Sequence, residues 1–524
     1  MHQPIRYLTL LPIEIWTLCW SLCSLRQQRR LSLVCKPFRS ITLPILFHHL
    51  SFDAGVDVAV FCMEKEDRIR RLRSMHRTAV RLEKLTQYYS QLQPALAPFV
   101  KSWTVVLGYQ ERYRIDNIGL SEALHTRIYE SFGKVLTLCY NLSAVHLKRL
   151  KMDTMLLSTV LSLPKLQHLT LDTRESTIVD TGGVLPRKTM LRSLDLSQDY
   201  LLREGFAEID LPILAHLTLH SVTEQESFFQ HVAERFTRLE TLTVDSIQGS
   251  DFPVIKTNSL PILRALTGPP TMITSLAPNR PITRVSIGNS TSTPASLLQT
   301  CAALSRSSVA VRTLHLPELH FIPQFLPWQS NSNSDGVNIN PLHDFLTQIA
   351  SLLPDLTELV LELPDPRPGF SCGYFGGGLN IDSELVGVDE LPILCDDTAF
   401  DGLPEHEVSD DEGDASDPAT NTDGSIILFD ESLGEIKIDF WQHDVFLYQI
   451  SPSSIPLPRS IEILHLHASW VGIPLALAAQ ERAVESLATA YPTLREVQLG
   501  LRRNSTWRRA GLSESLRRVV VKSS

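Results

Sequence analysis

Short apolar segments recur along the chain in the pattern apolar-x-x-apolar-x-apolar, in which the last x is usually polar. One copy is Leu166, Leu169 and Leu171, with Thr170 at the polar position. Alternating apolar and polar positions predict a short strand with one face in a core. The central residues of successive copies lie 23–25 residues apart, a period typical of repeats with one strand and one helix each. They are Val145, Leu169, Leu194, Leu217, Leu242 and Leu266.

The pattern continues more loosely, at 282–287, 311–316, 356–361, 461–466 and 494–499. Helix-compatible segments separate the copies, and several end at a proline ahead of the next strand, as at Pro164 and Pro212. Proline disfavours helix in the residue before it and so turns the chain back to the strand. One unit cannot bury its strand edge and its helix face alone. Stacked units do so, and we expect a curved solenoid with a parallel sheet on its concave side.

The predicted fold class is therefore α/β, with a leucine-rich-repeat-like solenoid over 99–363 that resumes in repeats at 436–510. The alternative is an ordinary α/β domain with unrelated amphipathic strands, which would not need a regular period. The insert at 364–435 is rich in Gly and Pro and then acidic. Its window Asp382–Glu435 holds 18 Asp or Glu and no Lys or Arg. Dense like charge with few apolar residues predicts disorder.

The N-terminal segment, residues 8–50, has a different pattern. Apolar residues at steps of three and four predict three short helices. About forty residues bury too little surface for comfortable independent stability, so we expect an apolar surface that a partner covers. Residues 57–98 hold a longer helical pattern, from Ile69 to Leu92. We interpret it as a connector helix packed on the first repeats, and a coiled-coil or calmodulin-type partner helix is the alternative.

At this point a resemblance to a known family can be stated. Residues 8–50 resemble an F-box in Leu11-Pro12, Glu14, Ile15, Leu33-Val34-Cys35, Phe38-Arg39 and Pro44-Ile45-Leu46-Phe47. The order of box, connector helix and irregular leucine-rich repeats also resembles fungal F-box proteins. The resemblance implies a non-catalytic substrate-recognition subunit of an SCF-type (cullin-RING) ubiquitin ligase. It further implies binding to a Skp-type adaptor, and through it to a cullin. The implied adaptor contacts are Leu11, Pro12, Ile15, Trp16, Leu22, Leu31, Val34, Cys35 and Phe38.

One departure from the family pattern favours a different function. The family usually carries an acidic residue and then a Leu-Leu-like pair ahead of the second helix, where this chain has Gln27, Gln28 and Arg29. The alternative function is a leucine-rich-repeat scaffold or protein-interaction module without a ligase.

The polar position of each predicted strand would face the concave side of the solenoid. These side chains are small, polar and of mixed charge, which suits recognition of a protein substrate by hydrogen bonds. The β preference of Thr explains part of the pattern without any function. The possible substrate face comprises His146, Thr170, Asp195, Thr218, Thr243, Ser286, His315 and His465.

Charge and composition disfavour several classes of function. The chain has 48 Lys or Arg and 58 Asp or Glu, a net charge of −10. Without the acidic window, 40 acids remain against 48 bases, a surplus too dilute to predict nucleic-acid binding. No apolar run reaches the ~20 residues of a membrane helix. The 8 cysteines form no C-x-x-C pair, which favours reduced thiols in a cytoplasmic or nuclear protein.

The sequence contains no recognisable catalytic or metal-binding pattern. The run Gly373–Gly378 lacks the Lys-Ser/Thr of a phosphate-binding loop. His48-His49 and His465/His467 have no cysteines at zinc-like spacing. We therefore expect a protein that is not an enzyme, with no cofactor and no metal.

Overall fold

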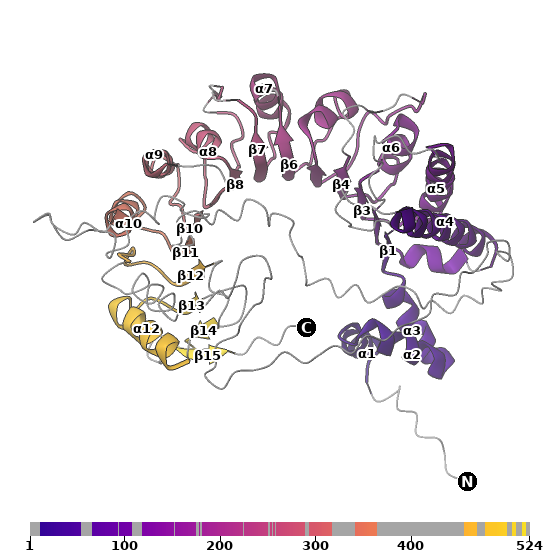
Figure 1. Cartoon of the computed structure of the whole chain (residues 1–524), viewed down its shortest axis with the longest axis horizontal. Helices are drawn as coiled ribbons and strands as arrows, with labels where there is room; N and C mark the ends of the chain where they lie inside the picture. The colour runs from indigo at the N-terminus through magenta and orange to yellow at the C-terminus, as the bar shows by residue number, and fades with distance from the viewer. Residues whose placement is uncertain are drawn as a thin grey trace, which may run out of the picture.

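The protein folds into a curved, open sheet covered by helices on its outer side (Figure 1). The computed structural model describes residues 11–53, 65–92, 94–106, 118–150, 152–173, 178, 181–223, 225–249, 252–253, 255–256, 258–288, 293–316, 341–363, 455–468, 477–499, 506–509 and 516–519. The predicted acidic window lies outside these residues. The predicted α/β class is confirmed.

The sheet contains fifteen strands, and their order in space is their order in the chain. Neighbours from β1 to β13 pair in parallel, and β14 and β15 add antiparallel strands at the C-terminal edge. The strands are β1 (His49–Asp53), β2 (Ser102–Val106), β3 (Ala144–Lys148), β4 (His168–Asp172), β5 (Ser193–Leu196), β6 (His216–Val222), β7 (Thr241–Ile247), β8 (Ala265–Gly268), β9 (Arg284–Ile287), β10 (Thr313–Leu316), β11 (Glu358–Leu363), β12 (Ile463–Ala468), β13 (Glu496–Leu499), β14 (Thr506–Arg508) and β15 (Arg517–Val519).

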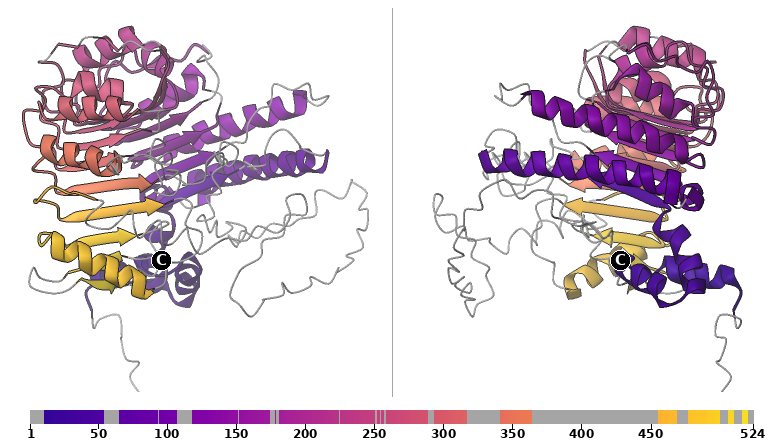
Figure 2. Two further views of the ribbon diagram at one scale, coloured as in Figure 1. Left: turned by 60° about the vertical axis from the view of Figure 1, so that its left-hand side comes forward. Right: turned by 90° about the vertical axis from the view of Figure 1, so that its right-hand side faces the viewer.

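Helices lie between most of the consecutive parallel strands and line the outside of the arc (Figure 1). Two of them, α4 and α5, are longer than the strands beside them and extend past one edge of the sheet (Figure 2). The helices of this layer are α4 (Lys65–Gln87), η3 (Tyr88–Leu92), η4 (Pro94–Phe99), α5 (Ile118–Leu138), α6 (Thr154–Leu161), η5 (Leu201–Gly205), α7 (Gln225–Arg235), α8 (Pro270–Leu276), α9 (Pro294–Leu304), α10 (Pro341–Leu352) and α12 (Leu477–Ala490).

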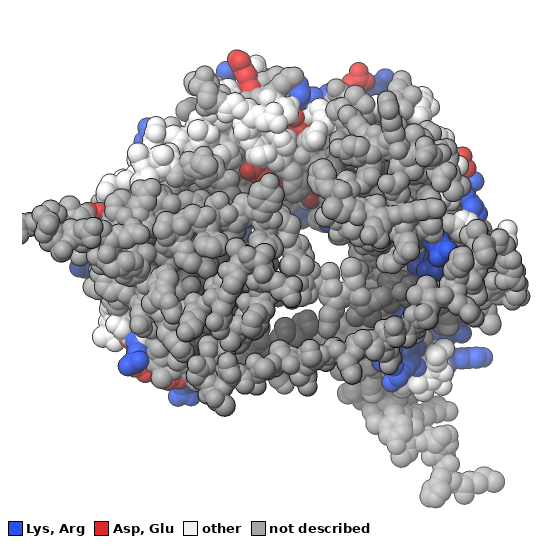
Figure 3. Space-filling model, in the orientation of Figure 1, with Lys and Arg blue, Asp and Glu red and all other residues white. Residues whose placement is uncertain are grey.

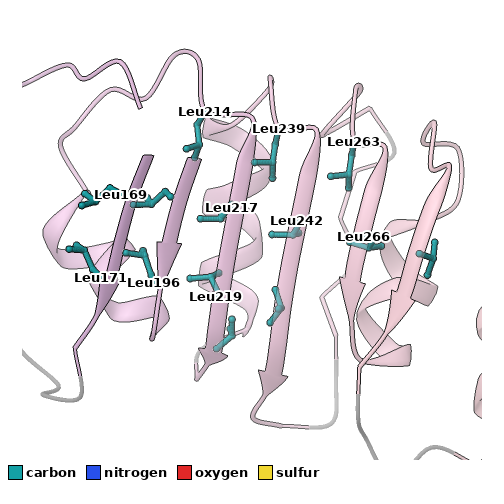
Figure 4. Packing of buried hydrophobic residues seen from close by; sticks show 14 of the residues in the cluster. Leu169, Leu171, Leu196, Leu214, Leu217, Leu219, Leu239, Leu242, Leu263 and Leu266 are labelled. Atoms are coloured by element: carbon teal, nitrogen blue, oxygen red, sulfur yellow. The ribbon is translucent and has the colours of Figure 1, made fainter. Parts of the chain in front are cut away.

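The core lies between the sheet and these helices and runs the whole length of the arc. Most of the parallel strands contribute alternate apolar side chains, such as Leu217 and Leu219 of β6, which are fully buried. Strand pairing places like residues side by side, with Leu217 opposite Leu242. Figure 4 shows these side chains pointing to the same side of the sheet. Burying one leucine contributes about 1.5–3 kcal/mol, so stacked units stabilise one another.

Three short helices form a separate cluster beside the N-terminal end of the sheet: α1 (Ile13–Ser21), α2 (Leu25–Val34) and α3 (Lys36–Leu46). We name this cluster the helical module. Its small core centres on Trp20, whose ring lies 4.6 Å from that of Phe38 and 5.6 Å from that of Trp16. The module joins the sheet directly, because β1 follows α3 and pairs with β2.

The two ends of the sheet differ most from the prediction made from the sequence. The sheet begins at His49, ahead of the predicted first repeat at 99, because the residues after α3 pair with β2. Trp103 and Val105 of β2 are fully buried, as their alternation indicates. At the other end, β14 and β15 do not follow the repeat pattern, because they are antiparallel.

Candidate functional site

The helical module exposes large apolar side chains on α1 and α2. Thirteen large apolar residues are exposed in the described part of the chain, and seven of them fall within residues 11–34. We name these seven the apolar helical surface. Leu22 is the most exposed, at 83%. The members are Leu11, Ile13, Ile15, Leu18, Leu22, Leu33 and Val34.

The predicted adaptor contacts fall into two groups in the structure. Six are exposed: Leu11, Pro12, Ile15, Leu22, Val34 and Cys35. Three are half-buried: Trp16, Leu31 and Phe38. Trp16 and Phe38 pack on Trp20, so part of each ring is already used by the module's own core. The predicted set omitted Leu18, which its spacing of three from Ile15 and four from Leu22 could have identified. It also omitted Ile13, which lies two positions from Ile15 and so on another face of α1.

The departure at Gln27 and Gln28 has a local structural cause. Ser24 precedes α2 and forms a capping box with Gln27, in which the Ser24 backbone N–H donates to Gln27 Oε1 at 2.8 Å. The Gln28 side chain is buried, and its Nε2 donates to the carbonyls of Trp20 and Cys23, both at 3.0 Å. Gln27 therefore caps α2, and Gln28 joins α2 to the end of α1.

The possible substrate face forms one continuous row across the sheet. Strand register pairs His146 with Thr170, Thr170 with Asp195, and so on along the arc. All eight predicted residues lie in this row, on the side opposite the buried leucines. The complete row is Ser51, Thr104, His146, Thr170, Asp195, Thr218, Thr243, Thr267, Ser286, His315, Val360, His465 and Gln498.

A chain of polar contacts links five side chains on the concave face between β3 and β7. His146 Nδ1 lies 3.0 Å from Thr170 Oγ1, and the Thr170 hydroxyl donates to Asp195 Oδ2 at 3.4 Å. Asp195 Oδ1 is 3.3 Å from His220 Nε2, and His220 Nδ1 is 2.5 Å from Asp245 Oδ2. His220 therefore lies between two carboxylates on neighbouring strands.

His220 was not among the predicted residues, although its position could have been found. It follows Leu219 by one residue, so extending the alternation of β6 by one position places it on the concave face. It also lines a hollow of about 410 Å³ together with Asp172, Thr173, Ser197 and Gln198. The carboxylates of Asp195 and Asp245 raise the pKa of the His220 imidazole to about 10.

This pKa predicts a pH dependence of stability. A histidine whose pKa is raised on folding stabilises the folded protein fully below its unfolded pKa of about 6.5 and loses that effect as pH rises through about 10. The side chain is 51% exposed, so solvent screening limits the contribution to about 1 kcal/mol. We expect the difference in free energy of unfolding between the native protein and His220→Gln to shrink between pH 7 and pH 10. Urea titrations at several pH values measure it, and a constant difference would contradict the ion pairs.

Histidines farther along the face also contact acidic side chains. His315 Nδ1 lies 3.1 Å from Ser286 Oγ, and its Nε2 lies 3.4 Å from Glu362 Oε1. His465 Nε2 is 3.5 Å from Glu496 Oε1. The concave face thus presents histidine–carboxylate contacts at three places.

The described residues contain no group of three His, Cys, Asp or Glu side chains that could hold a metal ion. The described cysteines are all unpaired thiols, and burial raises the pKa of Cys139 and Cys301 to about 12. No helix in the described part of the chain combines the length and apolarity needed to cross a membrane. Scans against models of known protein families and against curated proteins find no match for this chain.

Proposed function

We propose that this chain is the substrate-recognition subunit of an SCF-type (cullin-RING) ubiquitin ligase. The helical module would bind the Skp-type adaptor, and the concave face of the leucine-rich-repeat-like solenoid would bind the substrate protein. The observation that carries the proposal is that seven of the thirteen exposed large apolar side chains of the described residues fall within residues 11–34. Four of them, Leu11, Ile15, Leu18 and Leu22, follow one another at steps of four, three and four and so share one face of α1 and its ends. An exposed apolar face of this kind is a mark of a protein–protein interface.

The small core of the helical module supports the same proposal. Its core rests on Trp20 and Ile41, 5% and 6% exposed, while most apolar side chains of α1 face outward. Three helices of this size bury little surface on their own. A partner that covers the apolar helical surface would complete the core and stabilise the module by mass action.

The charges around this surface indicate the character of the partner. Between residues 11 and 47, Glu14 is the single acidic residue, against five basic ones. Lys and Arg atoms are visible in the region of α2 and α3 (Figure 3). An adaptor surface that is apolar and acidic would therefore complement the module and accelerate association. The basic residues are Arg26, Arg29, Arg30, Lys36 and Arg39.

In this function the chain itself makes and breaks no bonds. It would hold a bound protein near the ubiquitin carrier, and the rate would come from effective concentration and orientation. Such a receptor would work in the cytoplasm or the nucleus. The row of side chains on the concave face, which are polar at every position except Val360, offers hydrogen-bonding groups for this purpose.

The double substitution Leu11→Ala, Pro12→Ala tests the adaptor interface. We expect it to weaken capture of a purified Skp-type adaptor by about 10–100-fold, because central apolar contacts carry most of an interface's binding energy. Biolayer interferometry with the immobilised full chain measures the affinity. Met155→Ala is the matched control, since Met155 is an exposed apolar residue on α6, outside the module.

Unchanged adaptor affinity in the double variant would contradict this interface. If the native chain does not bind the adaptor at all, the scaffold alternative remains. Helix capping explains Gln27 and helix–helix contact explains Gln28 within the module; neither contact involves Arg29, and neither tests the scaffold alternative.

A further inference from the structure

Four exposed arginines lie at the end of the sheet where the parallel strands begin. Arg284 is the first residue of β9, and its neighbours Arg264 and Arg312 directly precede β8 and β10. Strand register pairs Arg284 with Ala265 of β8 and with Thr313 of β10, so Arg284 lies one residue farther along its strand than Arg264 and Arg312 do along theirs. Arg192, like Arg264 and Arg312, directly precedes its strand, which is β5. We name Arg192, Arg264, Arg284 and Arg312 the arginine row.

The guanidinium groups of the arginine row make no ion pair or hydrogen bond with any residue in the described part of the chain. Other arginines near the sheet are engaged. Arg508 Nε lies 2.8 Å from Glu496 Oε2, and Arg495 Nε lies 3.7 Å from Glu462 Oε2. The row therefore presents donors and positive charge that the fold does not use.

The positive charge of the arginine row affects the pKa of a histidine in the sheet. Burial lowers the pKa of His216 on β6, Arg192 and Arg284 lower it further, and Glu240 opposes them. The charges of Arg192, before β5, and of Arg284, on β9, thus both act on His216 and lie on opposite sides of β6. Glu240, directly before β7, is the acidic residue that interrupts the row.

Acidic side chains lie toward the other end of neighbouring strands. Asp172 is the last residue of β4, and Asp245 lies beyond the polar row on β7, beside His220. The arginine row thus lies where β5, β8, β9 and β10 begin, and these carboxylates form an acidic edge near the ends of β4 and β7. This polarity disfavours a nucleic acid, because the acidic edge repels phosphates. The polar row between the edges also lacks Phe, Tyr and Trp, on which bases stack.

We propose that the arginine row binds a carboxylate-rich, extended segment of the protein that the chain recruits. Five strand spacings of ~4.8 Å separate Arg192 from Arg312, about 24 Å, which an extended peptide covers in about seven residues. Arginine pairs well with carboxylates because its fork donates two parallel hydrogen bonds. The inference deepens the proposed function and rests on it, since the segment belongs to the recruited substrate.

Fluorescence anisotropy with the full chain tests this assignment. The probe is a labelled octapeptide of alternating Asp and Glu, and its Asn/Gln counterpart is the neutral reference. The key variant is Arg264→Gln, Arg284→Gln, Arg312→Gln. The matched control is Arg73→Gln, Arg77→Gln, Arg482→Gln, which removes the same charge from exposed positions on α4 and α12.

We expect the acidic peptide to bind, the neutral one not to bind, and the key variant to lose at least about tenfold in affinity. The control variant should lose little, and added salt should weaken binding, since the contacts are exposed. Bound peptide should also raise the pKa of His216, which NMR titration measures.

Equal losses in the key and control variants would overturn the proposal, because net charge alone would then explain binding. Preference for an eight-nucleotide oligouridine, lost in the key variant, would overturn it in favour of RNA. Peptide binding seen only after deletion of 382–435 would overturn it in favour of the chain's own acidic window. Adaptor capture by the key variant should stay unchanged. A chain that binds the peptide but not the adaptor would reject the proposed function alone.

Discussion

Replacing Arg280 by methionine is expected to lower the free energy of unfolding by about 3 kcal/mol. Arg280 is 1% exposed and follows α8. Its guanidinium donates to three backbone carbonyls, those of Ser259 at 2.9 Å, Leu276 at 2.6 Å and Lys256 at 2.8 Å. The side chain thereby joins the segment before β8 to the end of α8. Methionine fills similar volume but leaves three acceptors without a donor.

Two contributions to the free energy of unfolding oppose each other at Arg280, and their difference sets the size of the expected loss. Charged hydrogen bonds contribute about 1.5–3 kcal/mol each. Against this, burial of the guanidinium costs free energy, and it lowers the pKa of Arg280. The positive charge also complements the C-terminal end of α8. Because three bonds are lost and one desolvation cost is recovered, the net effect is destabilising.

Urea unfolding followed by circular dichroism measures the change. Arg306→Met is the matched control, because Arg306 is exposed and its backbone carbonyl accepts from the N–H of Asn279 at 2.9 Å, beside Arg280. We expect it to change stability by less than about 0.5 kcal/mol. Arg280→Lys should fall between the two, since an ammonium has three donors but cannot copy the planar fork. A loss below about 1 kcal/mol for Arg280→Met would show that water replaces the guanidinium.

Much of the sheet could be predicted because its signal is local. Each strand carries its own alternation, as in Leu169-Thr170-Leu171, and the repeat period places successive strands side by side. The polar row followed from the same alternation. Thr267 was not predicted as part of the row because Gly268 stands where other strands have their third apolar residue. That copy of the pattern is therefore incomplete.

The features that could not be predicted depend on contacts between distant residues. Nothing near Arg280 in the sequence shows that its side chain reaches the carbonyls of Lys256 and Ser259. The pairing of His220 with two aspartates requires the strand order and register as well as the alternation. The buried position of Gln28 requires knowing how α2 packs against the end of α1.

The substitution Trp20→Ala is expected to unfold the helical module and to abolish adaptor binding while the sheet stays folded. Trp20 is 5% exposed and packs between Trp16 and Phe38. Truncating a buried Trp costs about 3–5 kcal/mol. A module with so small a core has little stability to lose, whereas the core between sheet and helices does not include Trp20.

Limited proteolysis and adaptor capture together measure this effect. In Trp20→Ala, new cleavage should fall within residues 11–47, and the fragment from β1 onward should persist. The matched control is Trp103→Ala, because Trp103 is fully buried in β2, stacked 4.9 Å from Phe132. That change should open the sheet near β2 and α5. A Trp20→Ala chain that resists cleavage in 11–47 and still binds the adaptor would show that the module does not depend on its aromatic core. Because Trp20 is buried in the module and Leu22 is 83% exposed, Leu22→Ala should weaken the proposed adaptor binding without new cleavage. This variant separates loss of the module's fold from loss of contact.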